Sequence, residues 1–240
     1  TLAHVEAMNL QRAELARTVA LLESLSPDGW GAQTECPAWD VRRMYLHVLG
    51  ACEAAASMKE QVRQMRAAKR HQKTEGGPLE AGLSAVQVRE RESLSPTALV
   101  GRLTAIAPRT VKRRSSIPGF VRNRVSMKVD GPVVERWKLG YLVDTIYLRD
   151  LWLHRVDTCR ATGRPLELSA EHDGRIVADV VEEWARRHGQ PYTLELTGAA
   201  GGSFAAGDGR ERLTLDAVEF CRTLGGRVAG EGLLATIVPF

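Results

Sequence analysis

The feature that most constrains this chain is a segment with helical spacing, residues 148–157, that carries two ionisable side chains on one face. Asp150 and His154 are four residues apart, so they project from successive turns of a helix in the same direction. The rest of that face is apolar as far back as Leu139. A carboxylate buried with an imidazole needs a hydrogen-bond partner or a metal ion. A third ligand would complete a metal site, and His47 is the best candidate.

His47 lies on a second segment with helical spacing, which begins near Val41. Asp40 is expected to cap this helix, and Trp39 to pack on Met44 as a hydrophobic staple. Because His47 follows Met44 by three residues, it should point inward. A lone inward histidine is usually a core residue, and an aspartate four residues before a histidine often only hydrogen-bonds to it. Three such residues on two long helices favour instead a metal site inside a helical bundle.

The chain has 240 residues, of which 44% are apolar, which is enough for one large domain or two small ones. No apolar run approaches the roughly 20 residues needed to cross a bilayer, and the N-terminus lacks a basic segment followed by an apolar one. We therefore expect a cytoplasmic protein with no membrane partner. Its four cysteines form no Cys-x-x-Cys pair, which argues against a zinc ribbon or a dithiol site. Structural thiols are favoured, and Cys36 alone has a catalytic alternative.

The formal net charge is only +4, yet basic residues gather in the middle of the chain, between residues 63 and 128. Either this region faces an anion, or its charges lie on solvated helix faces and a mobile loop, which is the favoured interpretation. Nucleic-acid binding ranks last, because no aromatic residues are interleaved with the charges and no binding motif is present.

Apolar periodicity predicts four long helices in the first two thirds of the chain. They cover residues 2–24, about 41–70, a segment opened by Ser95 and Pro96, and about 134–161. Pro108 is expected to kink or end the third helix, and Gly163 to end the fourth. The segments 71–84 and 115–132 are predicted to be loops, the second long enough to suggest a function. Residues 1–163 are therefore predicted to form a four-helix bundle.

After Gly163 the pattern changes. Ser169 should cap a helix that ends at Gly189. Short strands are predicted at residues 192–197, 203–206 and 212–215 in a hairpin-like arrangement, with a turn at residues 207–209. The sequence Asp216-Ala217-Val218-Glu219 is a capping box for a last helix ending at residues 225–226. Residues 164–240 thus read as a small α/β domain, and the whole chain as α+β.

The chemistry of the three candidate ligands narrows the choice of metal. Two imidazoles and one carboxylate suit zinc, nickel or ferrous iron, and three protein ligands leave a position open for water or substrate. Zinc in such a site lowers the pKa of a bound water or thiol. Asp157, one turn beyond His154, either orients that ring or forms a surface ion pair with Arg155 or Arg160. The sequence leaves both possibilities open.

Two stretches together resemble a known family. The run Cys36-Pro37-Ala38-Trp39-Asp40-Val41-Arg42 leads to His47, and Asp150-x-x-x-His154-x-x-Asp157 follows about a hundred residues later. This order and spacing resemble the mycothiol-dependent maleylpyruvate isomerase family, which is related to DinB-like bundles. The tail, residues 216–227, is similar to the end of that family's C-terminal domain. The resemblance covers nearly the whole chain.

The resemblance implies a divalent metal, usually zinc, held by His47, Asp150 and His154 in an N-terminal DinB-like four-helix bundle. Arg227, near the C-terminus, would help to bind an anionic small-molecule substrate or the low-molecular-weight thiol. In the family's reaction the thiol of mycothiol adds to the double bond of maleylpyruvate, the new single bond rotates, and elimination gives fumarylpyruvate. Basic side chains near the mouth of the site would suit the two carboxylates of such a substrate.

One residue departs from the family pattern. The family usually has glutamate where this chain has Asp150, so the helix must come closer to the ion or the ion must shift. Three functions therefore remain open. The chain is expected to be a metal- and mycothiol-dependent isomerase, an S-transferase acting on another electrophile, or a non-catalytic metal-binding or regulatory bundle.

Overall fold

The computed structural model describes residues 2–130, 134–208 and 212–240. The fold is α+β, as predicted, and the chain divides into two compact units. One is His4–Arg164, and the other is Pro165–Phe240 together with Leu2 and Ala3. In the part of the chain described, no helix combines the length and apolar character needed to span a bilayer.

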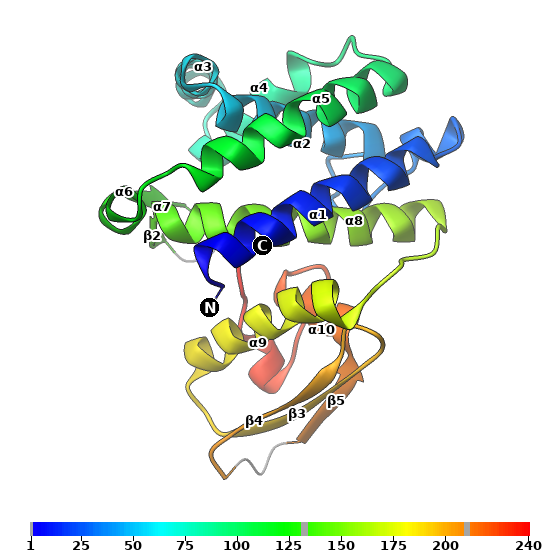
Figure 1. Cartoon of the computed structure of the whole chain (residues 1–240), viewed down its shortest axis with the longest axis vertical. Helices are drawn as coiled ribbons and strands as arrows, with labels where there is room; N and C mark the ends of the chain where they lie inside the picture. Colours follow the sequence, from blue (N-terminus) through cyan, green and yellow to red (C-terminus); the bar gives the residue numbers. More distant parts are fainter. Residues whose placement is uncertain (1, 131–133, 209–211) are drawn as a thin grey trace. The chain divides into compact units, whose positions relative to one another are not determined.

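The first unit is built around a four-helix bundle, which confirms the predicted fold. Its helices are α1 (His4–Glu23), α2 (Val41–Ala56), α5 (Pro96–Ser115) and α8 (Tyr147–Thr162). Helix α2 packs against α5, α5 against α1, α1 against α8 and α8 against α2, and Figure 1 shows the four lying alongside one another. Their inward faces bury large apolar side chains almost completely, among them Met44, Leu49, Leu103 and Trp152.

Local signals set the ends of these helices as the sequence predicted. The Asp40 side chain accepts a hydrogen bond from the backbone N–H of Arg43 at 2.7 Å, and so satisfies one of the donors left over in the first turn of α2. Ser95 caps α5 in the same way, with Pro96 in the first turn. Helix α8 stops at Gly163, whose φ of 65° is the left-handed conformation that glycine adopts without strain.

The predicted helix over residues 41–70 is two helices. Ser57 is extended, with φ −146°, and its side chain accepts from the backbone N–H of Glu60. It therefore ends α2 and caps a new helix, α3 (Met58–Glu75). The signal was a capping serine inside an otherwise helical pattern.

The predicted loop over residues 71–84 is wrong. Helix α3 continues to Glu75, and after a break at residues 76–78 a further helix, α4 (Leu79–Arg89), begins. The Gly-Gly-Pro sequence does break the chain, but only for about one turn. Helices α3 and α4 pack against each other and against α2, and this tertiary packing stabilises α4 although its sequence carries no strong helical stripe.

Pro108 was expected to kink or end its helix; it does not end it, because α5 runs through it to Ser115, and the kink stays a prediction. Pro108 is exposed, whereas the residues on either side that face the bundle, Leu103 and Val111, are buried. Burial of those flanking side chains offsets the backbone hydrogen bond that a proline inside a helix removes.

The stretch between α5 and α8 is more ordered than a loop. It contains α6 (Gly119–Arg124) and two strands, β1 (Ser126–Val129) and β2 (Glu135–Lys138), which pair antiparallel. The last two residues of the predicted loop, 131 and 132, lie outside the described residues. A helix was predicted from about residue 134, but β2 occupies its start. Helical structure begins with α7 (Leu139–Tyr141) and passes through a π-helical turn (Leu142–Ile146) into α8.

In the residues that the structure describes, the second unit contains two α-helices and a three-stranded sheet. Ser169 caps a π-helical turn that leads into α9 (Arg175–His188), and Gly189 ends α9 in the left-handed conformation. The strands are β3 (Tyr192–Thr197), β4 (Gly202–Ala206) and β5 (Arg212–Asp216), in the order β4-β3-β5. Asp216 caps α10 (Ala217–Leu224), as predicted.

The hairpin-like arrangement predicted for these strands is right for one pair only. Strands β3 and β4 are antiparallel, whereas β5 pairs parallel to β3. Central β3 is buried at alternate positions, Tyr192, Leu194 and Leu196, so one face of the sheet forms the core of the unit. The predicted turn around Gly209 falls partly outside the described residues.

The cap of α2 gives a first testable prediction. Replacing Asp40 with alanine should lower the free energy of unfolding by about 1 kcal/mol, because the first turn of α2 loses its hydrogen-bond acceptor. Asp40→Asn keeps an acceptor oxygen and should stay close to the wild type. Chemical denaturation of the three proteins measures the difference, and equal losses in both variants would contradict a capping role.

Candidate metal centre

The structure brings His47 of α2 together with Asp150 and His154 of α8. One potential ligand atom from each residue lies within 4.8 Å of the other two. His154 Nε2 is 3.3 Å from Asp150 Oδ1. The two imidazole rings meet nearly at right angles, at 86°, with their centroids 6.1 Å apart. The three side chains predicted as ligands are thus neighbours, and they lie on two helices that pack together.

The separation of these atoms fits a shared ion. Imidazole nitrogens and carboxylate oxygens bind zinc at 2.0–2.2 Å, so two such ligands at a tetrahedral angle are about 3.3–3.5 Å apart. The measured 3.3 Å between His154 Nε2 and Asp150 Oδ1 is within that range. The donor set and this distance therefore fit a divalent metal, with the third ligand atom, from His47, within 4.8 Å of the other two.

Burial differs across the cluster. The His154 side chain is only 5% exposed, whereas that of Asp150 is 35% exposed, so solvent reaches the cluster on its carboxylate side. Burial lowers the pKa of His47, and the nearby Asp150 carboxylate partly opposes that shift. A lowered pKa keeps His47 neutral near pH 7, and the neutral ring is the form that binds a metal.

A buried hydroxyl pair joins the two helices beside the cluster. Tyr45 Oη of α2 lies 3.0 Å from Thr158 Oγ1 of α8 and donates a longer hydrogen bond to the backbone carbonyl of His154. Burial raises the pKa of Tyr45, so the phenol stays protonated. This contact fixes where α2 and α8 meet, and so sets the distance between the two histidines.

Trp39 covers His47, a contact that the sequence did not predict, and the expected staple onto Met44 stays a prediction. Its ring stacks on the His47 ring with centroids 5.0 Å apart and also meets His154 edge-on at 6.3 Å. The loop before α2 holds Trp39 in place, because Thr34 Oγ1 and Gln33 Nε2 both donate to the Trp39 carbonyl. Sequence reasoning gave Trp39 only a packing role. Its position just before α2, eight residues or about two helical turns ahead of His47, was the only signal.

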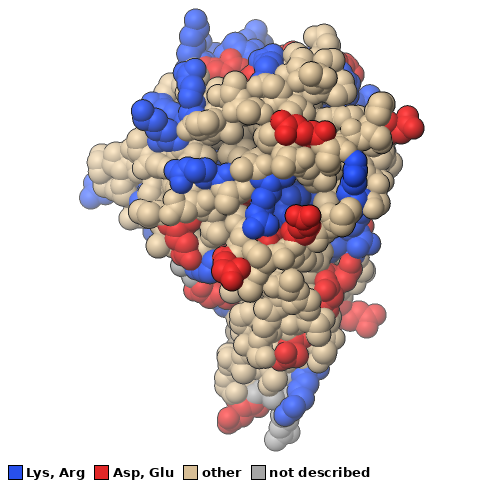
Figure 2. Space-filling model, turned by 45° about the vertical axis from the view of Figure 1, so that its right-hand side comes forward, with Lys and Arg blue, Asp and Glu red and all other residues tan. Residues whose placement is uncertain are grey.

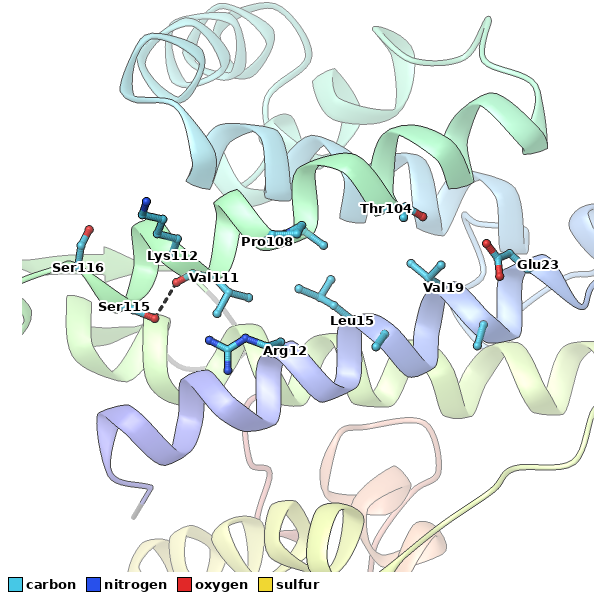
Figure 3. Close-up of a pocket in the computed structure, with 13 residues that line it drawn as sticks. Arg12, Leu15, Val19, Glu23, Thr104, Pro108, Val111, Lys112, Ser115 and Ser116 are labelled. Carbon is cyan, nitrogen blue, oxygen red and sulfur yellow. Dashed lines mark hydrogen bonds between the residues drawn. The ribbon is translucent and has the colours of Figure 1, made fainter.

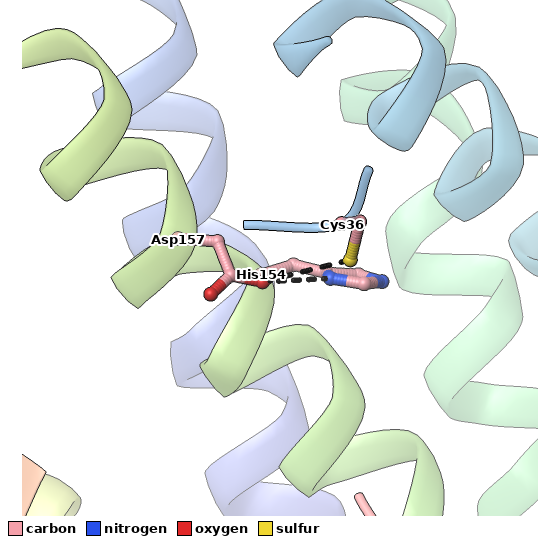
Figure 4. Close-up of side chains that lie close together, drawn as sticks. All are labelled: Cys36, His154 and Asp157. Carbon is pink, nitrogen blue, oxygen red and sulfur yellow. Dashed lines mark hydrogen bonds and ion pairs between the residues drawn. The ribbon is translucent and has the colours of Figure 1, made fainter. Parts of the chain in front are cut away.

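Asp157 and Cys36 lie on the other side of His154 (Figure 4). Asp157 Oδ2 is 3.9 Å from His154 Nδ1, and Cys36 Sγ is 4.0 Å from the same oxygen. Asp157 is completely buried, so the alternative of a surface ion pair is wrong, and Arg155 is instead paired with Glu14. This trio also lies within 4.8 Å, but its distances are longer than neighbouring ligands on zinc would show. It therefore fits a metal less well than the first cluster.

Arg227, the remaining predicted site residue, belongs to the second unit. It follows the end of α10, is half-buried, and donates its backbone N–H to the carbonyl of Arg222 at 2.8 Å. The cluster of His47, Asp150 and His154 is assembled within the first unit alone.

A groove of about 790 Å³ between α1 and α5 contains none of the predicted site residues (Figure 3). Its walls are mainly small and apolar, as at Leu15, Val19 and Pro108, with Arg12 and Lys112 among its charged residues. A large groove alone does not identify a site. The metal-binding side chains that converge between α2 and α8 are better evidence for a functional site than the volume of this groove.

Several charges of the basic middle segment are already paired. Arg63 binds Glu60 and Glu90, and Arg122 binds Asp144. On the face shown in Figure 2, Lys and Arg side chains are interspersed with acidic and uncharged ones. These pairings favour solvated helix faces over a surface for nucleic acid.

Comparisons with known proteins support the fold described above. No curated protein matches this chain. Among solved structures, the crystal structure of the mycothiol-dependent maleylpyruvate isomerase matches with a TM-score of 0.57 and 16% identity. A mutant of that isomerase matches with a TM-score of 0.56 and 16% identity. Both alignments cover 95% of this chain and 91% of the other, and they show a shared fold.

The family assignment rests on the sequence. A family model described as the mycothiol maleylpyruvate isomerase N-terminal domain matches residues 11–159. That range includes α2, most of α8 and all three residues of the cluster. The resemblance predicted from two short motifs is confirmed, and the chain belongs to the mycothiol maleylpyruvate isomerase family.

Proposed function

We propose that this protein is a metal-dependent isomerase that uses mycothiol as its thiol cosubstrate and acts on maleylpyruvate or a similar unsaturated dicarboxylic acid. One observation carries the proposal. In this member of the family, His47 of α2 and Asp150 and His154 of α8 each offer one ligand atom, and these atoms lie within 4.8 Å of one another. That donor set leaves a coordination position open for a thiol.

His47, Asp150 and His154 would hold the metal; this donor set suits zinc, nickel or ferrous iron, and zinc is proposed because the family usually holds it. When bound, the ion would lower the pKa of a coordinated thiol, so that the thiolate is available near neutral pH. The half-exposed Asp150 leaves one side of the cluster accessible to solvent, through which a thiol could enter. Trp39 stacks on His47 and covers one face of that ring.

Asp150 stands where the family usually has glutamate, so its reach must be tested. An aspartate is shorter by one methylene, yet Asp150 Oδ1 lies 3.3 Å from His154 Nε2, a spacing suited to two ligands of one ion. This distance supports Asp150 as a ligand. The shorter side chain would place the ion closer to α8.

In the proposed reaction the thiolate adds to the carbon–carbon double bond and forms a carbon–sulfur bond. The former double bond rotates, and elimination breaks the carbon–sulfur bond to return the thiol and the isomerised acid. Arg227 would bind a carboxylate of the substrate, because a guanidinium matches a carboxylate with two parallel hydrogen bonds.

S-transfer is the second candidate, since Asp150 departs from the isomerase pattern at a ligand position. The same activated thiolate would attack another electrophile, and the thioether would be the product rather than an intermediate. Supplying mycothiol with maleylpyruvate separates the two. An isomerase regenerates free thiol with each turnover, whereas a transferase consumes it.

The metal ligands give the central prediction. His47→Ala should lose most of the bound metal and at least about 100-fold in isomerisation rate, because one of three protein ligands is gone. Elemental analysis and the rate with and without a chelator measure both. His71→Ala, which removes a histidine of α3 outside the cluster, is the matched control. Wild-type protein without stoichiometric metal would refute the proposal.

The role of Arg227 makes a separate prediction. Arg227→Gln should raise KM for the dicarboxylic acid by about 10-fold or more, since a hydrogen bond to a charged group is worth about 1.5–3 kcal/mol, and should leave bound metal unchanged. Arg212→Gln, which removes an exposed arginine of β5 in the same unit, should change neither quantity. Equal KM values for Arg227→Gln and the wild type would exclude Arg227 from substrate binding.

The lowered pKa of His47 predicts how stability changes with pH. The ordinary histidine pKa is 6.5, and burial lowers that of His47 in the folded protein. As pH falls through 6.5 the unfolded chain binds a proton that the folded protein does not, so stability falls. With a chelator present, wild-type unfolding free energy should therefore decline more steeply from pH 7 to 5 than that of His47→Gln. Parallel curves would contradict this assignment.

A further inference from the structure

A chain of buried amides runs from α3 and α4 to the backbone of α2. Gln64 Nε2 donates to the Gly50 carbonyl at 3.0 Å and to Glu60 Oε1 at 2.9 Å. Both amide hydrogens of Gln64 are thus in use, so its Oε1 can only accept, and it accepts from Gln87 Nε2 at 2.9 Å. Gln64 and Gln87 are 0% and 2% exposed. Because Gln64 Oε1 can only accept, the Gln87 atom that faces it is Nε2, and the other atom of the Gln87 amide is the oxygen Oε1.

Gly50 makes room for Gln87 against α2. A Cβ at Gly50 would lie only 2.7 Å from Cβ and Cγ of Gln87, closer than packed carbon atoms approach. Gly50 comes three residues after His47, so the two share one face of α2. The missing side chain at Gly50 therefore lets Gln87 of α4 reach the helix beside His47.

Among the described residues, the buried side-chain atoms without an ordinary hydrogen-bond partner include Gln87 Oε1 and His47 Nδ1. A buried polar atom that lacks a partner costs about 1–3 kcal/mol. One of these atoms is an acceptor, and the other becomes a donor when it carries the ring proton. The Gln87 side chain also lies close enough to His47 to raise its pKa.

We propose that Gln87 is a positioning residue for His47: its Oε1 accepts a hydrogen bond from His47 Nδ1–H and so leaves Nε2 of that ring as the lone-pair donor toward Asp150 and His154. This inference rests on the proposed function, because it takes Nε2 of His47 to be the atom that would bind the metal. The ring of a histidine ligand is commonly held by a hydrogen bond to its other nitrogen, which selects the tautomer and the ring orientation. Gln64 holds the Gln87 amide by accepting its hydrogen bond, and the absence of a side chain at Gly50 leaves room for Gln87 beside α2.

Metal affinity tests the consequence. Gln87→Met keeps the length and burial of the side chain but has no amide acceptor, and it should weaken zinc binding by about 10- to 100-fold in competition with a chelator. Gln87→Glu keeps an acceptor oxygen and should bind more tightly than Gln87→Met. Gln11→Met is the matched control, because Gln11 is also fully buried and bonds to the Val143 carbonyl and to Arg114. It should lower stability without changing zinc affinity.

A second measurement separates this inference from the proposed function. Nitrogen chemical shifts of His47 in the metal-free wild type, at a pH where the ring is neutral, report which nitrogen carries the proton. The Nδ1–H tautomer is expected in the wild type, and a shift toward Nε2–H in Gln87→Met. If the wild type binds no zinc, the proposed function fails while the tautomer still tests Gln87. An Nε2–H ring in the wild type, or equal zinc affinity in Gln87→Met and wild type, would overturn the inference.

Discussion

The contact between α2 and α8 is the constraint on which the candidate centre depends. Tyr45 and Thr158 form a buried hydroxyl pair between these helices, and the same phenol reaches the carbonyl of His154. A hydroxyl buried without a partner is costly, so this pair resists sliding of one helix along the other. With that register set, imidazoles more than a hundred residues apart in the sequence lie with their centroids 6.1 Å apart. A shift of one residue along either helix would rotate one ring away.

The two histidines of the cluster have different neighbours. His47 is covered by Trp39, and His154 has the completely buried Asp157 beside its Nδ1. Each ring is thus enclosed on one side while Asp150 keeps the cluster open to solvent. A site that is closed around its ligands and open at one edge suits chemistry in which a small molecule must enter and leave.

Much of the fold followed from local sequence. Caps at Asp40, Ser95 and Asp216 and the left-handed glycine at 163 marked helix ends correctly, because a cap needs only residues within one turn. The same reasoning failed for α4, which depends on packing against α2 and α3 rather than on its own pattern. It left open whether Pro108 kinks or ends its helix, and α5 runs through that residue to Ser115.

By itself the sequence determined that Asp150 and His154 share a helical face and that His47 lies on another amphipathic helix, because the helical period relates only residues close along the chain. Tertiary structure alone decided that the faces meet, that Trp39 stacks on His47, and that Asp157 is buried. It also placed Gln87, on a helix that the sequence did not reveal, against the gap left by Gly50. These are contacts between segments far apart in the chain, and they depend on how whole helices pack.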